Sequence, residues 1–149
     1  MMLKKDIAIK SFNQINLNNN NMSEDIFKRI LQKEPNLTYL GFENPLNSSQ
    51  FQQNRQILEN GFNEFKTCCE WIEKHRTKIK KRDFRNYNYL RYHYNSYFLA
   101  HSIERWSQQN ISNGAFIASL IYFGISYKQI FGTPDISVYL GLNKTTPYI

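Results

Sequence analysis

The sequence contains little that could cross-link the chain or anchor it in a membrane. Its two cysteines, Cys68 and Cys69, are adjacent and cannot join distant parts of the chain by a disulfide. No apolar run approaches the roughly 18 to 20 residues that a membrane helix needs. The first residues, up to Asp6, lack the apolar core of a signal peptide. These absences predict a non-secreted, cytoplasmic protein without a membrane partner.

The motifs of common enzyme classes are also missing. There is no phosphate-binding loop, no dinucleotide-binding glycine fingerprint and no nucleophile elbow. The cysteines and the three histidines show no spacing typical of a zinc site. His101 and Glu104 are three residues apart on an expected helix and could orient an imidazole for acid–base chemistry, but such pairs are more often structural. We therefore expect a protein that is not an enzyme and that has no cofactor and no metal.

The positive charge, by contrast, is concentrated in one stretch. Residues 74 to 91 carry eight lysines and arginines and one acid, Asp83, which accounts for the whole formal net charge of +7. The rest of the 149-residue chain carries 11 basic and 11 acidic residues and is neutral. Seven phenylalanines and tyrosines fall within residues 84 to 98. Concentrated charge creates a local field that attracts polyanions.

This combination favours binding of nucleic acid, either DNA or RNA, with little sequence selectivity. Lysines and arginines neutralise phosphates, and exposed aromatic rings stack on unpaired bases for about 1 to 3 kcal/mol per base. We expect the contacts in residues 74 to 94, called the basic segment below. The predicted phosphate contacts are Lys78, Lys80, Lys81, Arg82, Arg85 and Arg91, and the predicted stacking residues are Tyr87, Tyr89 and Tyr92.

Other interpretations of the basic segment stay open. Its basic face could dock on an acidic protein, which would make the chain a non-catalytic adaptor or inhibitor within a larger assembly. Alternatively, the aromatic side chains could pack as a layer, and the lysines could serve only as its solvent-exposed surface. The order of two helices and a hairpin resembles a winged-helix domain, in which a recognition helix contacts bases in the DNA major groove. Such sequence-specific recognition is disfavoured, because the expected helix 112–124 contains no Lys, Arg, Gln, Asp or Glu to contact base edges. The oligomeric state is not indicated.

Hydrophobic periodicity and capping residues predict a mainly α fold of the α+β class, with about four helices. They are expected from the N-cap Ser23 to a stop at Pro35, then over residues 50–74 with Ser49 as a possible cap, 96–109 and 112–124. The last of these is apolar on every side and should therefore lie at the centre. Strands at 127–131 and 136–140 should form a C-terminal β-hairpin (127–140), with Ile136, Val138 and Leu140 facing inward. Residues 1–21 are expected to be a flexible arm, and residues 22–149 a single domain.

Three motifs carry a resemblance to a known family. They are HRTKI at residues 75–79, SYFLAHSIE at 96–104 and ISNGAFIA at 111–118. In this order they resemble a family of small proteins of bacteria and their phages or mobile elements, for which no activity is established. The family has a shorter link between the first two motifs, so residues 87 to 94 lie in an insertion. The resemblance implies a shared fold and a phage or plasmid context, and it transfers no functional residue.

Overall fold

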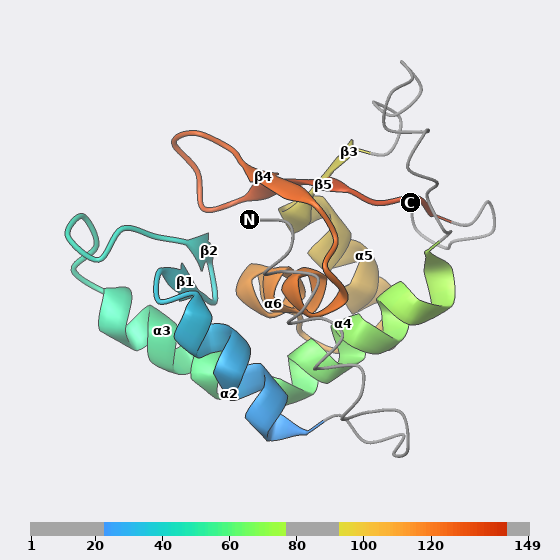
Figure 1. Cartoon of the computed structure of the whole chain (residues 1–149), viewed down its shortest axis with the longest axis horizontal. Helices are drawn as coiled ribbons and strands as arrows, with labels where there is room; N and C mark the ends of the chain where they lie inside the picture. Colours follow the sequence, from blue (N-terminus) through green and yellow to red (C-terminus); the bar gives the residue numbers. More distant parts are fainter. Residues whose placement is uncertain (1–22, 77–92, 143–149) are drawn as a thin grey trace.

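A computed structural model of the chain describes residues 23–76 and 93–142 (Figure 1). The described residues form five helices and two small antiparallel sheets, so the predicted α+β class is confirmed. The helices are α2 (Glu24–Lys33), α3 (Phe51–Glu59), α4 (Phe62–His75), α5 (Ser96–Ser107) and α6 (Asn113–Phe123). The strands are β1 (Leu37–Thr38), β2 (Gly41–Phe42), β3 (His93–Asn95), β4 (Tyr127–Gln129) and β5 (Ile136–Tyr139).

Helix α6 lies at the centre of the fold, as its apolar sequence predicts. It contacts α2, α4 and α5, which surround it in Figure 1. Ser112 caps its N-terminus by accepting a hydrogen bond from the Ala115 amide at 3.1 Å, and Gly124 ends it in the left-handed conformation. At Gly114 a Cβ atom would lie only 1.9 Å from the Thr38 carbonyl oxygen, so glycine permits the close approach of α6 to the β1 backbone.

Helix α2 also matches its prediction. Ser23 caps it, its apolar face is buried, and it ends at Lys33, two residues before Pro35. Arg55 from α3 donates hydrogen bonds to the carbonyl oxygens of Leu31, Glu34 and Leu37. These bonds satisfy carbonyls at the C-terminus of α2 and tie that helix to α3.

The single helix expected over residues 50–74 is wrong, because the chain forms α3 and α4 with a break at Asn60 and Gly61. Glycine is a poor helix former, by about 1 kcal/mol relative to alanine, and the chain turns there. The spacing of apolar residues suggested one continuous helix because both helices bury their apolar residues in the same core, including Leu58 and Phe65. Ser49 is not the cap of α3, whose N-cap is Gln50 without a side-chain bond.

Two predictions of burial on the helices are also wrong. Adjacent residues on a helix point about 100° apart, which predicts one buried and one partly exposed cysteine, but Cys68 and Cys69 are both buried, because α4 packs against three other helices. Burial raises the pKa of both thiols. The apolar pattern of residues 96–109 predicts that Phe98 is buried with Leu99 and Ile103, but Phe98 is 47% exposed, whereas Leu99 and Ile103 are buried.

The C-terminal hairpin is confirmed and belongs to a three-stranded sheet of order β3-β5-β4. Ile136, Val138 and Leu140 are buried, as their alternation predicts. Strand β3 was not predicted, because its three residues are too few to show a period. Residues 35–49 contain two prolines, a glycine and two serines, which predict a connector between the first two helices. They contain a second missed feature, the short antiparallel pair β1–β2. Among the described helices, none has both the length and the apolar character needed to span a bilayer.

Candidate functional site

The residues predicted to contact nucleic acid lie outside the described residues. They are Lys78, Lys80, Lys81, Arg82, Arg85, Arg91, Tyr87, Tyr89 and Tyr92. The predicted arm at residues 1–21 lies outside them as well. What the structure describes of the basic segment is its two ends, residues 74–76 and 93–94.

Both ends of the basic segment attach to the C-terminal strand region. Arg76 follows α4 in an extended conformation and pairs with Leu142. His93 begins β3 and pairs with Tyr139 of β5. Leu142 and Tyr139 are three residues apart, which is about 10 Å along a strand. The two described ends of the basic segment therefore lie at neighbouring places on the C-terminal strand region.

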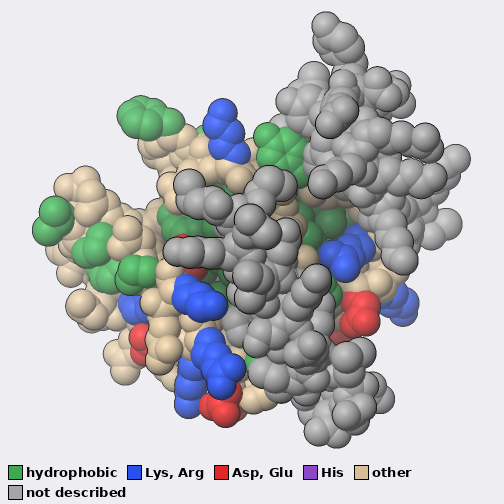
Figure 2. Space-filling view, viewed as in Figure 1, with side chains coloured by type: hydrophobic (Ala, Val, Ile, Leu, Met, Phe, Trp, Pro, Cys, Tyr) green, Lys and Arg blue, Asp and Glu red, His purple; other side chains and the backbone are tan. Residues whose placement is uncertain are grey.

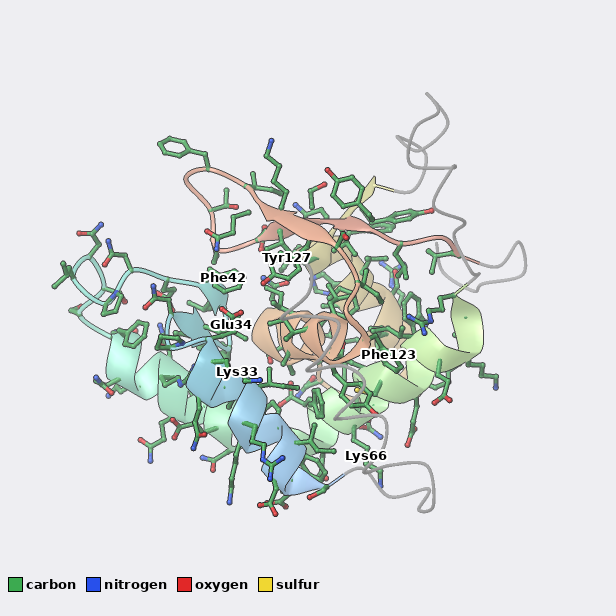
Figure 3. The ribbon with its side chains drawn as sticks, in the orientation of Figure 1. Lys33, Glu34, Phe42, Lys66, Phe123 and Tyr127 are labelled. Atoms are coloured by element: carbon green, nitrogen blue, oxygen red, sulfur yellow. The ribbon has the colours of Figure 1, made fainter. Side chains whose placement is uncertain are left out.

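Cations at the first end lie on aromatic rings. Lys74 Nζ is 5.9 Å from the centroid of the Trp106 ring, and the guanidinium carbon of Arg76 is 4.7 Å from that of Phe123. Phe123, labelled in Figure 3, comes from the last turn of α6. Such cation–π contacts stabilise charge next to apolar surface. They hold the start of the basic segment on the body with its positive charge retained.

His75 packs among aromatic rings at the same place. Its ring centroid is 5.6 Å from that of Trp71 and 5.6 Å from that of Trp106. Burial lowers the pKa of His75, and the adjacent charge of Lys74 lowers it further. A neutral imidazole is the form favoured here, so His75 acts as part of the aromatic packing and not as an additional cation.

A cavity of about 180 Å³ lies on another part of the body, between α5, the β1–β2 turn and the start of α6. Tyr39 and Leu40 contribute to its wall from the turn. Tyr97 and His101 contribute from α5, and Ile111 lies before α6. The exposed surface of the cavity is mainly apolar, and Glu104 and His101 are the acidic and the imidazole side chains that line it.

The His101–Glu104 pair noted in the sequence is present in this cavity. His101 Nδ1 is 3.4 Å from Glu104 Oε2, and Glu104 Oε1 accepts a hydrogen bond from the Ile111 amide at 3.2 Å. The carboxylate therefore contacts both the backbone before α6 and the imidazole. The Tyr97 ring meets the His101 ring edge-on, with centroids 4.4 Å apart and planes at 88°. These contacts hold the imidazole in one orientation at the cavity wall.

Hydrogen bonds from α6 position the β1–β2 turn, which forms the wall of the cavity opposite α5. Asn113 Nδ2 donates to the Leu40 carbonyl oxygen at 2.9 Å and to Asp135 Oδ1 at 2.9 Å. The Gly114 amide donates to the Tyr39 carbonyl oxygen at 3.0 Å. The turn is thus fixed to the central helix, and the cavity has rigid walls. Sequence reasoning missed this site because its turn residues are about 60 positions from α5 and carry no motif.

The described surface otherwise carries both signs of charge (Figure 2). Within residues 23–76 and 93–142 there are nine lysines and arginines and ten acids. No group of three or more His, Cys, Asp or Glu in these ranges could hold a metal ion. Leu46 and Phe131, which are 92% and 102% exposed, lie in two surface loops.

Comparison with known proteins finds no matching family model, no matching curated protein and no matching solved structure. The resemblance to a family of small proteins of bacteria and their mobile elements thus stays a prediction.

Proposed function

We propose that the protein is a non-catalytic accessory or regulatory protein that binds nucleic acid through the basic segment, with little sequence selectivity. The observation that carries the proposal is the separation of charge within the chain. The described residues hold nine basic and ten acidic side chains, whereas residues 77–92 hold six basic side chains and one acid. A nearly neutral body with one strongly basic stretch is suited to a polyanionic partner.

The attachment of the segment supports the same proposal. Arg76 and His93 pair with residues three positions apart in the C-terminal strand region, so the segment is joined to the body at one place. Lys74 and Arg76 add described positive charge at that place. Positive charges that lie close together can contact the same nucleic acid, and each phosphate that they neutralise adds to the binding free energy.

The proposal is tested by the salt dependence of binding. If about five phosphates are neutralised, log K for duplex DNA falls with log salt at a slope of about −4 to −5. We expect Lys80→Ala/Lys81→Ala to reduce the magnitude of that slope by about 1 to 2, because two cations no longer release counterions. The measurement is fluorescence anisotropy of a labelled duplex over a series of salt concentrations.

The matched control is Lys28→Ala/Arg29→Ala, which removes two exposed cations from α2. This pair should leave the slope unchanged. Equal effects of the two double variants would show that binding depends on overall charge and not on the basic segment, and would contradict the proposal.

The alternative is an adaptor or inhibitor that docks its basic face on an acidic protein. It predicts a partner that stays bound after nuclease treatment in a pull-down from native lysate, with one defined stoichiometry. A partner lost on nuclease treatment supports nucleic acid instead.

A further inference from the structure

The cavity beside α5 has the size and the wall chemistry for one small aromatic ring. Its volume is about 180 Å³, close to the roughly 150 Å³ of an engineered apolar cavity that admits benzene. A nucleobase fits this space, which is open to solvent on one side. The mainly apolar walls favour a flat, weakly hydrated ligand over a charged one.

The rings in the wall allow stacking. Tyr97 is 57% exposed and lies in the first turn of α5, and Leu40 is 40% exposed on the opposite wall. The imidazole of His101 packs against the Tyr97 ring, with perpendicular planes and centroids 4.4 Å apart, and supports that ring at the cavity wall. Unpaired bases are recognised by stacking on exposed aromatic side chains of this kind.

The polar end of the cavity is formed by His101 and Glu104, with His101 Nδ1 at 3.4 Å from Glu104 Oε2. Glu104 is a positioning residue here, because it orients the imidazole and is itself held by the Ile111 amide.

The cavity is also close to the basic segment along the chain. Residues of β3 pass directly into α5, as Figure 1 shows, with Asn95 capping the helix through the Tyr97 amide at 2.8 Å. From His93 to Ser96 an extended chain spans about 10 Å. A nucleic acid strand held at the end of the basic segment can therefore also reach Tyr97.

We propose that this cavity binds one unpaired base of a single-stranded nucleic acid, stacked on Tyr97. The inference rests on the proposed function, and it names single strands as the preferred ligand. It extends the predicted stacking residues to Tyr97, which lies just after the basic segment.

The test compares two single strands of equal length and equal phosphate number, an oligothymidylate and an abasic oligomer, by fluorescence anisotropy with the full chain. The wild-type protein should bind the oligothymidylate more tightly. Tyr97→Ala should lower that affinity by about 5- to 100-fold, the range expected for one stacked base, and leave abasic binding within about twofold. Tyr97→Phe retains the ring and should retain the affinity.

Phe131→Ala is the matched control, since it removes a fully exposed aromatic ring from the loop between β4 and β5. It should change neither affinity. Circular dichroism of Tyr97→Ala should match the wild type, because the side chain is mostly exposed.

Three outcomes overturn the inference. If Tyr97→Ala binds oligothymidylate as well as the wild type while salt-dependent binding to both strands persists, the cavity is not a base site, and the proposed function stands. If the wild type binds no strand or duplex at low salt, both proposals fail. If thymidine monophosphate binds as tightly as the oligomer in a Tyr97-dependent way, the ligand is a free nucleotide and not a strand.

Discussion

Tyr127 shows how a single residue couples the packing of the fold to pH. Its ring stacks on Phe42 with centroids 6.0 Å apart, and the two rings lie together between β2 and β4 in Figure 3. Burial raises the pKa of Tyr127 to about 12, and the charge of Glu34 contributes in the same direction. The neutral phenol is thus the form that the folded state favours.

We expect the free energy of unfolding to fall as the pH rises from about 10 towards about 12. In the unfolded chain Tyr127 ionises near its ordinary pKa of about 10, whereas in the folded state it must stay protonated. The contribution of Tyr127 to the free energy of unfolding is complete below a pH of about 10. It is lost as the pH rises towards the folded-state pKa of about 12. Tyr127→Phe keeps the ring and removes the ionisable group, so urea unfolding should show a shallower decline for the variant. Parallel declines in the two proteins would contradict the assignment.

At the scale of elements, the helix ends determine how α6 fits into the core. Ser112 Oγ accepts from the Ala115 amide, and the Ser112 amide donates to Glu64 Oε1 at 2.6 Å. One residue therefore caps α6 and ties it to α4. The break between α3 and α4 lets both helices bury apolar faces in the same core, which one straight helix of that length could not do.

Ser112→Ala should lower the free energy of unfolding by about 1 kcal/mol, because the Ala115 amide loses its acceptor. Ser49→Ala is the control. Ser49 is exposed and caps no helix, so its replacement should be neutral within about 0.5 kcal/mol. Urea denaturation measures both values. A neutral Ser112→Ala would indicate that water or another group satisfies the amide.

At the scale of the whole molecule, the basic segment and the folded body are separable in sequence and joined at one place. The core of buried side chains lies in the described residues and draws on α2, α3, α4, α5, α6 and β5. The pairs Arg76–Leu142 and His93–Tyr139 are the described junctions. Folding energy should therefore come mainly from the body, and binding energy from the segment.

Replacing residues 77–92 by a neutral Gly/Ser linker of about eight residues tests this separation. Such a linker spans up to about 26 Å and can join Arg76 to His93 without strain. We expect the thermal unfolding midpoint to stay within a few degrees and the salt-dependent binding to be lost. A second variant keeps the natural length and replaces only the six basic residues by Gln. Loss of folding in both variants would show that the segment contributes to the core.

Much of the fold could be predicted from local signals. Ser23, Ser112 and Gly124 mark helix ends because they satisfy backbone groups within a few residues, and such signals need no knowledge of distant contacts. The candidate site could be predicted only in part. The pair His101–Glu104 is visible as a three-residue spacing, but nothing near it in sequence indicates that Tyr39 and Leu40 complete a cavity.

The sequence by itself determined the α+β class, the central place of residues 113–123 and the concentration of positive charge, because composition and periodicity depend on neighbouring residues alone. Only the tertiary structure decided the break at Gly61, the burial of both cysteines, the exposure of Phe98 and the cavity beside Tyr97. Each of these depends on which elements pack together. A periodic pattern marks an apolar face, but it does not specify which partner covers that face.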